Sequence, residues 1–187
     1  MGRWEPNAAG RLREAAMDLY VERGFEQTTV AEIAERAGLT ARTFFRYFSD
    51  KREVLFGGSV ELQEHLVQAL AAAPDGAPPM EAVAAALDAA AVLLGDNRKF
   101  SQRRQSVIAA NVELQERELM KMASLSVAFA DGLRRRGASD VDARLTAEAG
   151  VAIFRVAFER WVSEPGVKAL LQVVRDSVDQ LKALTAE

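Results

Sequence analysis

Proline and glycine lie at a few points of this 187-residue chain, and the stretches between them repeat apolar residues with helical spacing. Pro6, residues 74–79 and residues 164–166 separate long stretches in which apolar side chains recur every three or four positions. No segment alternates apolar and polar residues between hairpin turns, as a half-buried strand does. The pattern therefore predicts an all-α fold of about nine helices.

The spacing places four helices before the proline-rich segment 74–79. They are predicted at residues 7–23, 30–37, 41–48 and from residue 51 onward, and five more at residues 80–94, 99–110, 113–136, 141–163 and 167–184. We interpret residues 1–57 as an N-terminal three-helix domain and residues 58–187 as a C-terminal helical bundle domain.

Composition removes most catalytic and metal chemistry from consideration. The chain has no cysteine, which excludes disulfides, a thiol nucleophile and Cys-ligated zinc, and its single histidine, His65, excludes a histidine-rich metal site. No Gly-rich phosphate loop is visible. We therefore expect neither an enzyme nor a protein with a metal ion or cofactor.

The start of the chain and its apolar runs bear on location. Residues 1–10 are polar and carry Arg3 and Glu5, which is unlike a signal peptide. The longest apolar-rich run, residues 82–94, is interrupted by Asp88 and is too short to span a bilayer. We expect a soluble cytoplasmic protein with no membrane partner.

Residues 29–48 have the sequence form of a helix-turn-helix motif. They read TVAEIAERAGLTARTFFRYF, two short helical patterns joined at Gly38, where the chain needs a positive φ. Thr29 and Glu32 form the capping box of the first helix, and Thr40 caps the second. The motif predicts that the second helix packs one face on the first and leaves the other outward.

The outward face of the second helix is unusual for a solvated surface. Its predicted members are Ala41, Arg42, Thr43, Phe45, Arg46 and Tyr47. Arginines contact guanine edges or phosphates, and an aromatic ring contacts a thymine methyl, so the pattern indicates DNA recognition. The whole chain has a net charge of −3, yet residues 39–52 carry four cations against Asp50 alone. The alternative is a pair of core helices in an ordinary bundle.

The motif resembles the N-terminal DNA-binding domain of the TetR family of repressors, over about residues 8–57. The resemblance implies a variable helical domain that dimerises and binds a small ligand. It implies that Thr43 and Tyr47 contact phosphates, that Phe45 lies against a thymine, and that Lys51 contacts the DNA backbone. The predicted DNA-binding residues are Thr29, Arg42, Thr43, Phe45, Arg46, Tyr47 and Lys51. Arg42 stands where members often carry a small residue, and Phe45 where they usually carry Tyr.

Residues 103–122 resemble the C-terminal domain of some actinobacterial TetR-like regulators, including one linked to mycofactocin clusters, for which acyl-CoA is implicated. Arginines there suit a phosphate or carboxylate, and aromatic residues suit an apolar pocket. The predicted ligand-binding residues are Phe100, Arg103, Arg104, Phe129, Phe154 and Phe158. The alternatives are a solvated helix face for the arginines and core packing for the aromatic residues.

The last two predicted helices carry apolar stripes that suit a homodimer. A two-fold four-helix interface would bury both stripes. Its predicted members are Val151, Trp161, Leu170, Val174, Val178 and Leu181. The alternative is that these stripes complete the core of the single chain.

These patterns together predict a ligand-responsive transcriptional regulator, most often a repressor in the family that it resembles. It would bind a near-palindromic double-stranded DNA operator as a homodimer, and a small-molecule effector, such as acyl-CoA or another amphiphile, would release it. The alternative from another class is a ligand-binding or scaffold protein without DNA binding.

Overall fold

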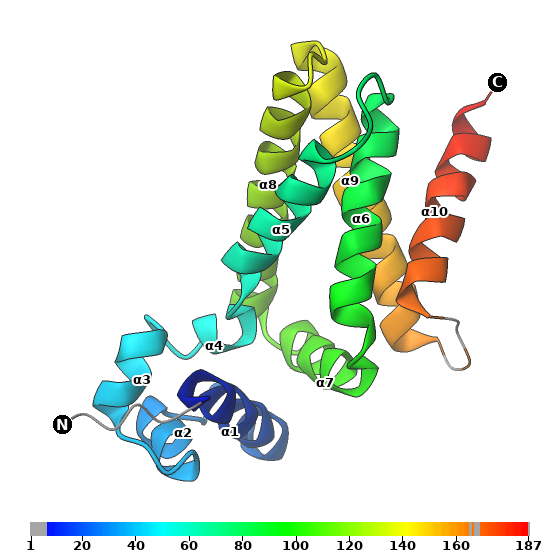
Figure 1. The fold of residues 1–187 in the computed structure, drawn as a ribbon. Helices are drawn as coiled ribbons and strands as arrows, with labels where there is room; N and C mark the ends of the chain where they lie inside the picture. The colour runs from blue at the N-terminus through cyan, green and yellow to red at the C-terminus, as the bar shows by residue number, and fades with distance from the viewer. Residues whose placement is uncertain (1–6, 165, 167–168, 187) are drawn as a thin grey trace. The chain divides into compact units, whose positions relative to one another are not determined.

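The computed structural model describes residues 7–164, 166 and 169–186, and these residues form helices and connecting loops without a strand (Figure 1). This confirms the all-α fold. The helices are α1 (Ala8–Arg23), α2 (Val30–Arg36), α3 (Ala41–Tyr47), α4 (Glu53–Phe56), α5 (Ser59–Ala71), α6 (Pro79–Gly95), α7 (Arg98–Ala109), α8 (Val112–Arg135), α9 (Asp140–Ser163) and α10 (Leu170–Thr185).

The fourth predicted helix is divided into α4 and α5. Two glycines interrupt it, and Gly58 takes a φ of +88°, which a right-handed helix does not accommodate. At Gly57 an added Cβ would lie 2.9 Å from a ring carbon of Phe48, so the chain passes too close to this ring for a side chain. The predicted start of the last helix, at residue 167, lies outside the described residues.

The chain divides into two compact units, each made of two segments that are not continuous in sequence. The first unit contains the residues up to Gly58 together with residues 103–118, and the second contains residues 59–102 and 119–187. Helices α7 and α8 therefore each contribute residues to both units. The division expected from sequence places residues 103–118 in the second domain instead. The functional division at residues 57 and 58 stays a prediction.

The first unit is built around one face of α1. Leu12, Ala16 and Leu19 are buried there, together with Ile33 of α2 and Phe44 of α3. These side chains follow the three- and four-residue spacing of an amphipathic helix, so burying them orders α2 and α3 against α1.

The second unit has one large apolar core drawn from α5, α6, α8, α9 and α10. Its helices approach closely where α9 carries Gly150, at which an added Cβ would lie 2.4 Å from a methyl group of Val83 on α6. At the edge of this core Arg175 of α10 donates to Asp88 of α6, with a shortest N–O distance of 2.8 Å.

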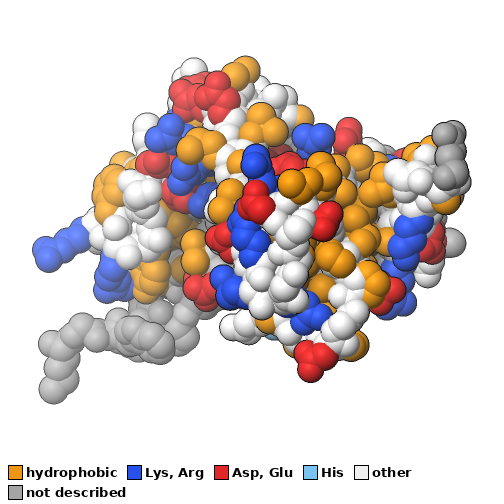
Figure 2. Space-filling view, turned by 90° about the horizontal axis from the view of Figure 1, so that it is seen from above, with side chains coloured by type: hydrophobic (Ala, Val, Ile, Leu, Met, Phe, Trp, Pro, Cys, Tyr) orange, Lys and Arg blue, Asp and Glu red, His pale blue; other side chains and the backbone are white. Residues whose placement is uncertain are grey.

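The surface mixes side chains of both charges with apolar ones, as Figure 2 shows for one face. Several exposed apolar residues lie on α9, where Val141, Leu145 and Val156 expose 64%, 66% and 50% of their area. No helix in the described ranges is long and apolar enough to cross a membrane.

Candidate nucleic-acid interface

Local hydrogen bonds define the start of α2. The Glu32 backbone N–H donates to the Thr29 hydroxyl at 3.3 Å, and the Thr29 N–H donates to the Glu32 carboxylate at 2.9 Å. This confirms the predicted capping box. The same Thr29 N–H bond lowers the pKa of the Glu32 carboxyl, and Arg23 adds an ion pair at 2.9 Å. Because its hydroxyl already caps the helix, Thr29 is held at the exposed end of α2.

The turn between α2 and α3 is a Schellman motif centred on Gly38. Gly38 has a φ of +66°, its N–H donates to the Glu35 carbonyl at 2.9 Å, and the Leu39 N–H donates to the Ala34 carbonyl at 2.8 Å. The Arg11 guanidinium of α1 also donates to the carbonyl of Ala37 at this helix end. The turn therefore has a fixed geometry that is tied to α1.

The third helix is oriented by a cap at its start and a ring cluster on its inner face. The Thr40 hydroxyl accepts from the Thr43 N–H at 3.2 Å. Phe44 is fully buried, and its ring centroid lies 5.6 Å from that of Phe48. These contacts decide which face of α3 is left outward.

The outer face of α3 exposes arginine and aromatic side chains, as the sequence analysis predicted. Phe45 and Tyr47 expose 56% and 39% of their area, and Arg42 and Arg46 are exposed as well. Arg46 donates to the Tyr47 hydroxyl at 3.0 Å and lies over its ring at 4.9 Å. Phe45 is supported edge-on by Phe44 at 5.5 Å. Contacts of these residues with DNA stay predictions.

Lys51 is engaged within the protein. Its ammonium group donates to the carbonyls of Phe25, Glu26 and Thr28 at 2.9, 3.2 and 3.1 Å, and it lies 4.3 Å from the Phe25 ring centroid. These bonds use all three donors of the ammonium group. Lys51 therefore ties the start of α4 to the loop between α1 and α2, and its predicted contact with the DNA backbone would share or replace one of these bonds.

Neighbouring charges limit the positive face. Arg52 donates to Asp50 at 2.9 Å, and this bond lowers the pKa of the Asp50 carboxyl, so the two charges largely cancel. Arg42 and Arg46 thus supply the positive charge that α3 presents outward. The charge count of residues 39–52 already set Asp50 against the four cations, and the structure identifies Arg52 as the cation that Asp50 pairs with.

The predicted ligand-binding residues fall into different compact units. Arg103 and Arg104 belong to the first unit, where Arg103 pairs with Asp18 and Arg104 with Glu118. The aromatic members lie in the second unit: Phe129 and Phe154 are buried in its core, and Phe100 and Phe158 are half-buried. The arginines thus have protein partners, and their contact with a ligand stays a prediction.

The predicted dimer residues occupy a different place from the expected one. Five of the six are buried in the core of the single chain and expose at most 8% of their area: Val151, Trp161, Leu170, Val174 and Val178. The sixth, Leu181, is half-buried against the same core. We correct the assignment accordingly, because side chains that are already buried against the core of their own chain offer no free surface to a second chain. A homodimer would need the outer faces of these helices.

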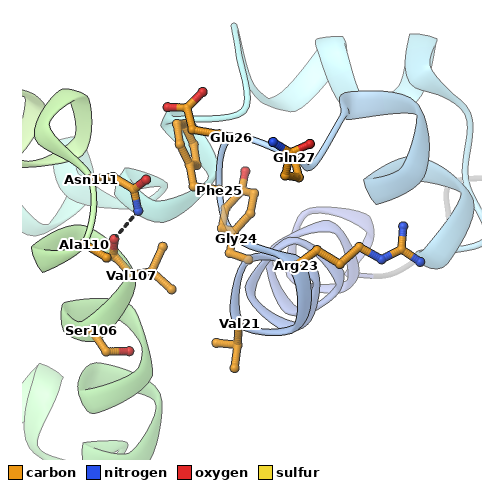
Figure 3. A pocket seen from close by; sticks show the side chains of 11 residues that line it. Val21, Arg23, Gly24, Phe25, Glu26, Gln27, Ser106, Val107, Ala110 and Asn111 are labelled. Atoms are coloured by element: carbon orange, nitrogen blue, oxygen red, sulfur yellow. Dashed lines mark hydrogen bonds between the residues drawn. The ribbon is translucent and has the colours of Figure 1, made fainter.

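One cavity of about 380 Å³ lies within the first unit, between the end of α1 and the turn after α7 (Figure 3). Val21 and Phe25 contribute from one side, and Val107 and Asn111 from the other. Asn111 donates to the Val107 carbonyl at 2.7 Å, which shapes this wall. None of the predicted ligand-binding residues lines this cavity.

The supporting roles of Arg11 and Lys51 could not be predicted from sequence. The bonds of Arg11 and Lys51 each cross 23 to 26 residues of chain, so neither spacing nor charge pattern reveals them.

Two family models match the chain. The model of bacterial regulatory proteins of the tetR family matches residues 12–56, and the MftR C-terminal domain matches residues 77–186. The fold and the outward face of α3 agree with the class of helix-turn-helix DNA-binding regulators. The chain belongs to the TetR family.

Individual relatives agree with this assignment. The HTH-type transcriptional regulator TcmR of Streptomyces glaucescens is 37% identical over 42% of this chain and 35% of its own length. MftR of Mycobacterium tuberculosis, named for transcriptional regulation of mycofactocin biosynthesis, is 31% identical over 36% of this chain and 33% of its own length. The match thus spans about a third of these curated relatives.

A solved structure extends the likeness in fold to nearly the whole chain. The transcriptional regulator FadR of Bacillus subtilis, in complex with stearoyl-CoA, has a TM-score of 0.63 and 19% identity, covering 92% of this chain and 96% of its own. At this identity the likeness concerns the fold alone.

Proposed function

We propose that the chain is a ligand-responsive repressor that binds a near-palindromic operator as a homodimer and leaves it when a small-molecule effector binds. The observation that carries this proposal is the outer face of α3, where Arg42, Phe45, Arg46 and Tyr47 are exposed together. A protein without a partner for this face gains nothing from exposing two aromatic rings beside two arginines.

Each exposed side chain has a DNA group that suits its chemistry. Arg42 and Arg46 present guanidinium forks that match the O6 and N7 acceptors of guanine. The Phe45 ring suits a thymine methyl, whereas Thr43 and the Tyr47 hydroxyl suit phosphate oxygens. Thr29 lies at the start of α2, where helix N–H groups and hydroxyls favour a phosphate. Lys51, as a cation, completes the proposed set of DNA-binding residues by contacting the DNA backbone.

We assign the homodimer contact to the outer stripe of α9 in place of the residues predicted from sequence. Val141, Leu145, Ala152 and Val156 are all exposed and fall within about 60° of one another around the helix. Such a stripe buries apolar area when a second copy packs on it with two-fold symmetry. The two copies of α3, the proposed recognition helices, would then lie about 34–36 Å apart and match successive major grooves.

We assign the effector to the second unit and propose acyl-CoA or a similar amphiphile. The MftR-type C-terminal domain and the fold shared with an acyl-CoA-bound regulator support this chemistry. The aromatic residues Phe100, Phe154 and Phe158 would accept an acyl chain. An effector that prefers a conformation with wrongly spaced reading helices lowers operator affinity by its difference in binding free energy.

Genomic footprinting with the purified chain tests this proposal. Fragments of the source genome are incubated with protein, with and without palmitoyl-CoA, and protected sites are sequenced. We expect a few near-palindromic sites, one of them beside the chain's own gene, and loss of protection with palmitoyl-CoA. Uniform or absent protection would favour a ligand-binding or scaffold protein without DNA binding.

A further inference from the structure

The tip formed by the end of α7 and the start of α8, residues 103–118, carries three arginines that all bind other helices of the first unit. Arg103 pairs with Asp18 of α1, Arg104 Nε donates to the Leu55 carbonyl of α4 at 2.9 Å, and Arg117 Nε pairs with Glu53 of α4. Each arginine lies 49 to 85 residues from its partner. These three pairs therefore join distant segments of the chain.

Arg104 is the most enclosed of the three. Its side chain exposes 19% of its area, its Nη1 donates to Glu118 at 3.0 Å, and it lies 5.0 Å from the Phe56 ring centroid. Burial lowers the pKa of the Arg104 guanidinium, and the Glu118 carboxylate opposes that effect. Only a planar guanidinium reaches a carbonyl and a carboxylate together in this way, so the residue type fixes how α4 meets the tip.

The tip also makes one ion pair in which it supplies the carboxylate. Glu113 of α8 lies 3.8 Å from Arg52, just before α4, and within the tip itself Gln105 donates to Glu118 at 3.5 Å. The partners at positions 18, 53 and 55 lie on α1 and α4, and the partner at position 52 directly precedes α4. A single contact would let the helices rotate about the tip. Contacts on both α1 and α4 restrict that rotation.

We propose that residues 103–118 are a positioning element for the DNA-binding helices, and that Arg104 and Arg117 serve this purpose instead of binding an effector headgroup. The inference rests on the proposed function, because a position matters only if α3 reads DNA. The reading module of this chain is then residues 7–58 together with the tip. Arg104 and Arg117 hold α4, and α4 with α1 sets the direction in which α3 presents its outer face.

A charge swap between Arg117 and Glu53 in the full chain tests the pairing. The variants are Arg117→Glu, Glu53→Arg and the double swap, and amide hydrogen exchange is followed in α1, α4 and, as an internal reference, α9. We expect each single variant to speed exchange in α4 about three- to tenfold, and the double swap to restore it. Exchange in α9 should not change.

The matched control is the pair Arg175 and Asp88 in the second unit, whose shortest N–O distance is 2.8 Å. Its single reversals should leave exchange in α1 and α4 unchanged. If the reversals at Arg117 or Glu53 unfold the chain, Arg117→Gln and Glu53→Gln give the same comparison, with about twofold faster exchange expected in α4.

Binding measurements separate positioning from effector binding. Each single reversal should weaken binding to the footprinted operator about fivefold, the double swap should recover it, and the affinity for palmitoyl-CoA should stay constant. Unchanged exchange in α4 for both singles, or a double swap no better than the singles, would overturn the positioning role. So would Arg117→Glu that weakens palmitoyl-CoA binding with normal exchange. If the wild-type chain binds no DNA, the proposed function fails, and the exchange experiment still decides whether the tip holds α4.

Discussion

Lys51 is where the structure changes an expectation most directly, and Lys51→Met tests the change. Sequence resemblance assigns its ammonium group to the DNA backbone, whereas in the structure the group donates to three carbonyls between Phe25 and Thr28. Methionine keeps much of the apolar stem and removes the donors and the charge. The variant therefore separates support of the α1–α2 loop from contact with a phosphate.

The expected loss of stability follows from these bonds. A hydrogen bond from a charged group contributes about 1.5–3 kcal/mol when it is shielded from water. Lys51 is half-buried and water can replace part of each bond, so we expect a total of about 2 kcal/mol. Local opening of residues 25–29 should then become about 30-fold more frequent, since 1.4 kcal/mol corresponds to a factor of ten.

Amide hydrogen exchange of the free protein measures this opening. The matched control is Lys182→Met on α10, because the ammonium of Lys182 lies 3.9 Å from Asp179 in an exposed pair and should matter little. Faster exchange at residues 25–29 in Lys51→Met alone is the expected result. Unchanged exchange, with a salt dependence of DNA binding reduced by about one counterion, would refute the structural role and support the phosphate contact.

Three further predictions concern DNA, the core and the dimer. Phe45→Ala and Arg42→Ala should each cost about 1–3 kcal/mol in operator binding, measured by fluorescence anisotropy, and unchanged affinity in both would defeat the assignment of α3 as the recognition helix. Val174→Asp, which buries an unpaired carboxylate in the core, should destabilise the chain by about 3 kcal/mol or more in urea unfolding, and a folded, stable variant would show that this core is misassigned. Leu145→Asp with Val156→Asp should keep the helical circular dichroism spectrum and yield a monomer in sedimentation; a dimer of normal affinity would place the interface elsewhere.

Much of the candidate site could be predicted from sequence because its determinants are local. The capping box at Thr29, the positive φ at Gly38 and the cap at Thr40 each involve residues at most five positions apart. Apolar spacing likewise placed Phe44 inside and Phe45 outside. The interruption at Gly57 and Gly58 was missed, because the apolar spacing continues across it and two glycines alone do not end a helix pattern.

Sequence could not decide the assignments that depend on what a helix face contacts. The stripe containing Val174 and Val178 was assigned to a second subunit, with the chain's own core as the alternative, and the structure places it in the core. For Arg103 and Arg104 the sequence suggested either a ligand or a solvated helix face, and the structure pairs them with Asp18 and Glu118. An apolar stripe or a cluster of cations on a helix does not indicate which protein segment, ligand or second subunit it contacts.

The sequence by itself therefore determined the all-α class, the helix-turn-helix and the outward chemistry of α3, because caps, glycine conformations and apolar periodicity act within one or two helical turns. The tertiary structure alone decided that Lys51 holds the α1–α2 loop, that the α7–α8 tip belongs to the same compact unit as the helix-turn-helix, and that the stripe on α10 is internal. Those outcomes depend on side chains 23 to 85 residues apart meeting in space, and the chain's local pattern does not encode which distant partner each one finds.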